Sequence, residues 1–156
     1  MLEQVARLAM DRHYVMLGIN LTISTIIMYF VMFSMIDSTS SFFHNINMFY
    51  MALTMVAPMG MLMLLTMGSM YQSRRLNLAL HAGLALLFVA ALLGTRSQAA
   101  IGDAQFLRSM IPHHSGAVLM CREAPVRDPE IVALCGQIIE SQQREIEQMK
   151  HILERL

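Results

Sequence analysis

Residues 46–70 read INMFYMALTMVAPMGMLMLLTMGSM and contain no charged side chain. From Met48 to Met70 an α-helix rises about 33 Å at 1.5 Å per residue. That length is close to the hydrocarbon thickness of a bilayer, which takes about 20 apolar residues to cross. The stretch therefore predicts a transmembrane helix.

Two further apolar stretches flank this one, at about residues 14–36 and 76–93. Between Tyr14 and Thr95 the only charged side chains are Asp37, Arg74 and Arg75, whereas charges recur every few residues from Arg96 onward. This uneven distribution is typical of a membrane protein with a water-facing part. We therefore expect an all-α chain with a three-span membrane domain (residues 1–95) and a helical, extracytoplasmic domain (residues 96–156).

The basic residues predict the orientation of the three spans. Arg7 and Arg12 precede the first span, Arg74 and Arg75 separate the second from the third, and the 37–45 loop has no Lys or Arg. The positive-inside rule then places the N-terminus in the cytoplasm and the C-terminal domain outside. We expect a multi-pass protein of the bacterial cytoplasmic membrane. The formal net charge of zero gives no electrostatic reason to expect nucleic acid as a partner.

Methionine is concentrated in the membrane domain, where 11 of the 17 methionines lie between Met28 and Met70. At about 100° per residue, those of the second span fall mostly on one side of a helix. Thioether sulfur selects soft ions such as Cu(I), although methionine also packs well in irregular apolar cores. The stripe therefore predicts either a packing face or a metal path formed by His44, Met48, Met51, Met55, Met59, Met63 and Met67.

After Thr95, apolar residues recur at three- and four-residue steps and predict helices at about 100–123 and 129–155. Asp128 followed by Pro129 is a favourable N-cap and first helical residue. Folding the chain back at residue 128 brings Cys121 opposite Cys135 and His114 opposite Gln142. Two such helices bury little surface by themselves, so we expect a second copy to complete a four-helix bundle.

Residues 110–114, Met-Ile-Pro-His-His, carry the strongest chemical signal, with Met120 and Cys121 two turns further on. Imidazole binds copper and zinc, and thioether favours Cu(I) over Cu(II), so we expect a copper ion, with zinc as an open alternative. Adjacent histidines on a helix point about 100° apart, which makes one ion shared by both difficult. Cys121 and Cys135 are interpreted as a disulfide, as soft ligands or as unpaired core residues.

The double motif of this domain, Asp103-x-x-Phe106-x-x-x-Met110-Ile111-Pro112-His113-His114-x-x-Ala117-x-x-Met120 and then Ile139-x-x-Gln142-x-x-Glu145-Ile146-x-x-Met149, resembles the bacterial domain-of-unknown-function family three hundred and five. That family includes CopM-like copper-binding proteins, and the resemblance implies a ferritin-like helical fold. It also implies a set of candidate metal ligands: Met110, His113, His114, Met120 and Met149, with Asp103 and Glu145 as weaker ligands or supporting partners.

The membrane domain is similar in pattern to the three-span copper transporters, because Met51 and Met55 stand four residues apart in the second span. Three functions follow from these patterns. The first is capture or buffering of copper by a membrane-anchored homodimer or higher homo-oligomer. The second is a copper conduit along the methionine stripe. The third, a ferritin-like oxidoreductase, lacks the Glu-x-x-His pairs of that class, so we expect no enzymatic activity.

Overall fold

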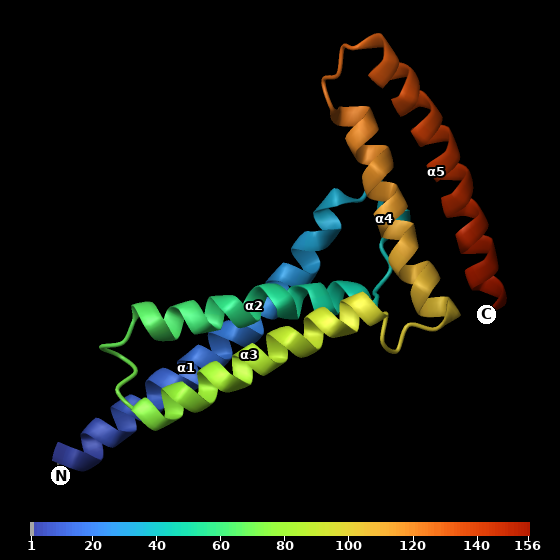
Figure 1. Ribbon diagram of the computed structural model, residues 1–156. Helices are drawn as coiled ribbons and strands as arrows, with labels where there is room; N and C mark the ends of the chain where they lie inside the picture. The colour runs from blue at the N-terminus through green and yellow to red at the C-terminus, as the bar shows by residue number, and fades with distance from the viewer. Residues whose placement is uncertain (1) are drawn as a thin grey trace. The chain divides into compact units, whose positions relative to one another are not determined.

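The computed structural model describes residues 2–156, with side chains described from Arg12 onward, and every regular element in this range is helical (Figure 1). The prediction of an all-α chain with three membrane-length helices and a C-terminal helical hairpin is confirmed. The elements are α1 (Leu2–Val31), η1 (Met32–Met35), η2 (Thr39–Ser41), α2 (Ile46–Thr66), α3 (Arg74–Ser97), α4 (Asp103–Glu123) and α5 (Pro129–Arg155).

Three helical segments are long and apolar enough to cross a membrane, namely Arg12–Met35, Ile46–Thr66 and Arg74–Ser97. They match the predicted spans to within about four residues at each end. The third span ends at Ser97, four residues beyond the predicted end at residue 93, because the helix is terminated by Gln98. Gln98 takes a left-handed conformation (φ 53°), and its N–H bonds the carbonyl of Gly94, a common way to end a helix.

The chain divides into two compact units. The membrane unit comprises residues 1–30 and 49–99, and the hairpin unit comprises residues 31–48 and 100–156. The hairpin unit is therefore larger than the predicted domain of residues 96–156, because it also contains the connection between the first two spans. The sequence predicts a loop at residues 37–45, and the structure places the short helix η2 within it.

In the membrane unit, α2 packs through its small side chains. Ala52, Ala57 and Gly60 are buried, and a Cβ atom on Gly60 would lie only 3.0 Å from side-chain atoms of both Leu21 and Leu84. Helices in lipid associate through such close contacts, because apolar side chains gain nothing by leaving lipid for one another. Glycine at position 60 therefore fixes the spacing of the three spans.

In the hairpin unit, α4 and α5 pack antiparallel around a core of Leu107, Ile111, Ile146 and Met149. The turn was predicted correctly. The Oδ1 atom of Asp128 accepts hydrogen bonds from the backbone N–H groups of Glu130 (2.9 Å) and Ile131 (3.2 Å), and Pro129 begins α5. These bonds satisfy donors that a helix N-terminus otherwise leaves unpaired.

Residues 31–48 pack against α4 through η1 and η2. The backbone N–H of Asp37 donates to the buried hydroxyl of Ser115 at 2.8 Å. Asn45, which is 5% exposed, accepts a hydrogen bond from the N–H of Met48 and thereby caps α2. Its amide also donates to the carbonyl of Phe43 at 3.0 Å. The connection is thus a structured part of the hairpin unit.

Candidate functional site

The candidate site lies on the seam between α4 and α5, where the Nδ1 atom of His114 is 2.9 Å from the Oε2 atom of Glu145. The His114 side chain is 13% exposed, and its Nδ1 atom is buried. The carboxylate stands outside the direction of a good hydrogen bond to this nitrogen, so the contact is chiefly electrostatic. The Glu145 carboxylate is therefore the contact partner of a buried imidazole nitrogen inside the hairpin.

Burial lowers the pKa of His114 below its ordinary value of 6.5. The carboxylate of Glu145 opposes this shift and raises the pKa, while neighbouring His113 adds to the lowering. The imidazole is consequently neutral at pH 7, and neutral imidazole is the form that binds metal ions.

Two of the predicted thioether ligands lie along the same seam. Met149 is buried in the hairpin core, and Met110, one turn before His114 on α4, packs against that core. The seam thus combines an imidazole, a carboxylate and two thioethers.

The remaining predicted ligands of the hairpin face outward. His113 is exposed, with its ring centroid 6.0 Å from that of His114. Asp103 is exposed at the start of α4, and Met120 is 54% exposed. Within the described range, no three His, Cys, Asp or Glu side chains converge as a preformed metal site. Any metal held on the seam of one copy must therefore use thioether sulfur or ligands from elsewhere.

Cys121 and Cys135 face each other across the hairpin, as the fold-back predicted. Both are free thiols, and a hydrogen bond with Cys135 raises the pKa of Cys121. The contact is compatible with each of the three interpretations made from the sequence: disulfide formation, soft-metal binding or simple packing.

The methionine stripe of the second span does not line the packed interior of one copy. The buried face of α2 is formed by Ala52, Val56, Ala57, Gly60 and Leu64, whereas Met51, Met55 and Met67 are 46%, 43% and 39% exposed. Met48, Met59 and Met63 are half-buried. A path enclosed on all sides by these sulfur atoms is therefore not formed by the described residues of a single chain.

His44 does not continue the helical stripe, because α2 begins at Ile46 and Asn45 caps it. The imidazole instead lies in an aromatic cluster, with its ring centroid 4.9 Å from that of Phe42 and 6.2 Å from that of Phe33. His44 therefore lies outside the helix that carries the methionine stripe.

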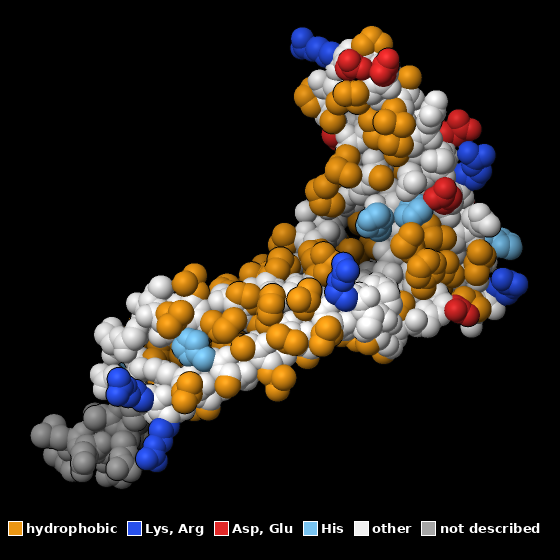
Figure 2. Space-filling model, in the orientation of Figure 1, with side chains coloured by type: hydrophobic (Ala, Val, Ile, Leu, Met, Phe, Trp, Pro, Cys, Tyr) orange, Lys and Arg blue, Asp and Glu red, His pale blue; other side chains and the backbone are white. Residues whose placement is uncertain are grey.

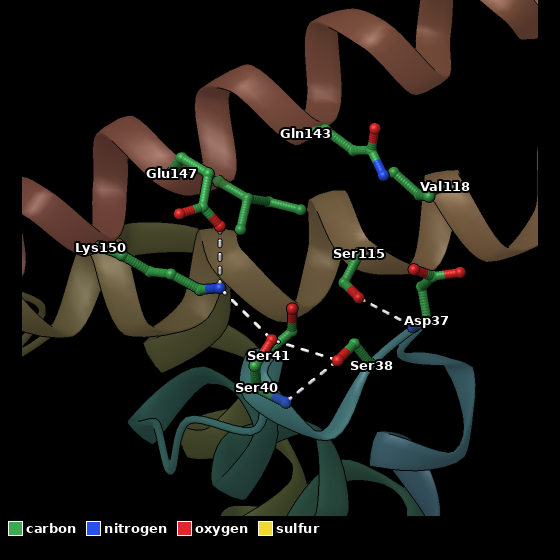
Figure 3. Close-up of a pocket in the computed structure, with 10 residues that line it drawn as sticks. Asp37, Ser38, Ser40, Ser41, Ser115, Val118, Gln143, Glu147 and Lys150 are labelled. Atoms are coloured by element: carbon green, nitrogen blue, oxygen red, sulfur yellow. Dashed lines mark hydrogen bonds and ion pairs between the residues drawn. The ribbon is translucent and has the colours of Figure 1, made fainter.

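A polar pocket of about 320 Å³ opens where residues 37–41 meet α4 and α5 (Figure 3). Lys150 donates to Glu147 Oε1 at 3.0 Å and to Ser40 Oγ at 3.4 Å, and Arg122 pairs with Asp37. Each of these two basic side chains is thus paired with an acidic one. The contacts of Arg122 with Asp37 and of Lys150 with Ser40 link the connection to the hairpin. The lining residues are Asp37, Ser38, Ser40, Ser41, Ser115, Val118, Gln143, Ile146, Glu147 and Lys150.

Sequence reasoning missed this pocket because its serines show no periodicity and no metal-ligand spacing. The only available signal was Asp37, the single acidic residue between Tyr14 and Thr95, which required a partner near the membrane boundary. The space-filling view shows the difference between the units: the membrane helices are largely covered by hydrophobic side chains, and the acidic side chains in this view stand on the hairpin unit, whereas basic and histidine side chains stand on both (Figure 2).

Comparison with known proteins identifies the hairpin region. Residues 87–153 match the family described as "Domain of unknown function (DUF305)". No solved structure matches the chain. A protein of Acanthamoeba polyphaga mimivirus named "Uncharacterized protein L153" is 38% identical over 112 residues, covering 70% of this chain and 72% of the viral protein.

The likeness to the viral protein extends beyond the hairpin, because 70% of the chain is more than residues 87–153 contain. It therefore includes part of the membrane unit. The chain belongs to the same family as this viral protein, and its C-terminal part is a DUF305 domain.

Proposed function

We propose that this chain is a membrane-anchored protein that binds copper, as Cu(I), on the seam of its hairpin unit at the outer face of a cytoplasmic membrane. The observation that carries the proposal is the imidazole of His114, which is buried, kept neutral by that burial and in contact with the Glu145 carboxylate at Nδ1. A carboxylate on one imidazole nitrogen is a common way for proteins to orient a histidine that binds a metal ion.

The neighbouring side chains favour a soft ion over a hard one. Met110 lies one turn from His114 on the same side of α4, and Met149 is buried in the core that Met110 contacts. Thioethers select Cu(I), whereas Zn²⁺ in structural sites takes four ligands from Cys, His and carboxylates. The absence of three converging ligands of that kind among the described residues supports copper over zinc.

Titration of the full chain in detergent with Cu(I), against a chromophoric chelator, tests the proposal. Wild type is expected to bind Cu(I), and His114→Ala is expected to lose this binding at the hairpin. His151→Ala is the matched control, because this histidine is exposed on α5 and belongs to no proposed site. Equal hairpin binding by wild type and His114→Ala would overturn the proposal.

A second copy is proposed to cover the outer part of the hairpin. Met120, Ile131, Val132 and Leu134 are large apolar side chains that remain 46–54% exposed. Exposed apolar side chains grouped in this way favour a partner surface. Sedimentation of the full chain in detergent should give a dimer or a higher oligomer, and Leu134→Lys should shift it toward monomer. A wild-type monomer would contradict this assembly.

The same assembly bears on the conduit, because the exposed Met51, Met55 and Met67 would require neighbouring copies to enclose a path. Copper movement into vesicles should separate the two functions. Binding alone predicts that Met51→Leu with Met55→Leu leaves Cu(I) affinity unchanged and that no transport occurs. A conduit predicts uptake that this double variant stops.

A further inference from the structure

His81 is an imidazole inside the membrane unit whose two nitrogens have different environments. Its Nδ1 atom lies 2.8 Å from the backbone carbonyl oxygen of Asn77, so Nδ1 carries the proton and donates it. The lone pair then resides on Nε2, which is buried and has no hydrogen-bond partner among the residues that the structure describes. This arrangement, a backbone carbonyl on one nitrogen and a free second nitrogen, is how proteins orient a metal-binding histidine.

The register of α2 and α3 shows what lies opposite His81. Gly60 lies against Leu84, and Tyr50 lies against Gly94, so the two helices are antiparallel with a consistent pairing. Met63 is three residues after Gly60 on α2, and His81 is three residues before Leu84 on α3. In this antiparallel register, Met63 is therefore at the same level as His81. Met63 also packs against the same core cluster as Leu80 and Leu84, which lie within one turn of His81 on α3.

We propose that His81 and Met63 form a second soft-metal site, inside the membrane unit and separate from the hairpin site. The imidazole supplies Nε2 and the thioether supplies its sulfur, a combination that suits Cu(I). Met70 packs against the same cluster.

The depth of His81 makes a charged ion tolerable at this position. His81 is seven residues from the start of α3 at Arg74, which is about 10 Å along the helix. The site is thus near one end of the span, and a monovalent ion there is less costly than at the centre of the bilayer. An unoccupied Nε2, by contrast, leaves an unpaired acceptor in an apolar interior.

The test uses the full chain with the hairpin histidines removed, His113→Ala with His114→Ala, in lipid nanodiscs. Cu(I) titration of this variant should show one remaining equivalent. Adding His81→Leu should abolish it, and adding Met63→Leu should weaken it at least about tenfold. Met16→Leu is the matched control, because Met16 is 46% exposed on α1 and belongs to no proposed metal path, and it should leave the affinity unchanged.

Two further measurements distinguish a metal site from simple packing. X-ray absorption of the copper-loaded variant should show nitrogen and sulfur scatterers, with the sulfur signal reduced by Met63→Leu. Cu(I) should also raise the melting temperature of the His113→Ala/His114→Ala chain but not that of the chain that also carries His81→Leu.

The inference is overturned if the hairpin-deficient chain binds no Cu(I), or if His81→Leu leaves its binding intact. Neither result would affect the proposed function, because that rests on the loss of binding in His114→Ala when His81 is present. Conversely, retention of one equivalent by the hairpin-deficient chain supports the membrane site even if the hairpin proves not to bind copper.

Discussion

The Nη1 atom of Arg122 on α4 donates to both carboxylate oxygens of Asp37, at 2.9 Å to Oδ1 and 2.7 Å to Oδ2, although 85 residues separate the two in the chain. Hydrogen bonds between two ionised groups are stronger than those between neutral groups. Together with the Asp37–Ser115 hydrogen bond, this ion pair attaches Asp37 to the C-terminal half of α4.

Replacing Arg122 by Ala should loosen this attachment without unfolding the chain. The Arg122 side chain is 42% exposed, and exposed ion pairs contribute about 1 kcal/mol or less. Amide hydrogen exchange at residues 37–41 should therefore become faster, while protection of α5 stays the same. Arg144→Ala, on the exposed side of α5, is the control. Unchanged exchange at residues 37–41 would show that the ion pair does not hold them.

Removing the carboxylate of Glu145 should lower the pKa of His114 further. Burial lowers this pKa and Glu145 raises it, so Glu145→Gln leaves the lowering influence unopposed. The shift can be followed from the His114 ring proton signals by NMR titration. A rise in the His114 pKa of this variant would contradict the assigned contact.

The same pKa sets the sign of a pH effect on stability. The folded-state pKa of His114 is below that of the unfolded chain, so protonation favours unfolding. The contribution is complete above about pH 6.5 and is lost as pH falls through the lower folded-state pKa. Melting temperatures between pH 7.5 and 5 should fall more in wild type than in His114→Gln, where that proton-binding group is absent. If the melting temperatures of the two proteins fell equally with pH, the assigned pKa shift of His114 would be contradicted.

The thiol pair makes a prediction about reactivity. The hydrogen bond with Cys135 raises the pKa of Cys121, so less of the reactive thiolate is present at neutral pH. Cys135→Ala should lower the pKa of Cys121 toward its ordinary value and accelerate its alkylation by iodoacetamide. The control is alkylation in unfolded protein, where wild type and variant should react at the same rate. Slower alkylation in the folded variant would argue against the contact.

Enlarging Gly60 should destabilise the membrane unit. A Cβ atom there would press on Leu21 and Leu84 at 3.0 Å, and overpacking of this kind costs about 1–3 kcal/mol. Gly60→Val should therefore lower the melting temperature in detergent. Gly18→Val is the matched control on α1, because a Cβ atom on Gly18 meets no atom within 4 Å. Equal melting temperatures for the two variants would show that Gly60 does not set the helix spacing.

The elements that could be predicted from sequence are those with strong local signals. Long uncharged stretches gave the three spans, and Asp128 with Pro129 fixed the start of α5. The pairing of Cys121 with Cys135 followed from symmetry about the turn. His114 was expected opposite Gln142 but contacts Glu145, one turn further on. Helix side chains lean toward the N-terminus of their helix, so the long Glu145 side chain reaches back toward the Gln142 level.

The connection between the first two spans could not be predicted in the same way. Its serines and asparagines have no periodicity, and the carboxylate of Asp37 finds its partner 85 residues away. The register of α2 against α3 likewise depends on Gly60 and Gly94, whose role appears only once their neighbours Leu84 and Tyr50 are known. Long-range packing of this kind determines which methionines face inward, and composition alone does not.

Residues 31–48 and 100–156 build one unit although two spans separate them in the chain. During synthesis, the first piece leaves the ribosome roughly 5–20 s before α5 is finished, at about 5–20 residues per second. For that interval its partners on α4 and α5 do not yet exist, and two more helices must enter the bilayer meanwhile. The unit can therefore be completed only after α4 and α5 have been synthesised, and residues 96–156 transplanted alone onto another anchor would lack the packing that residues 31–48 supply.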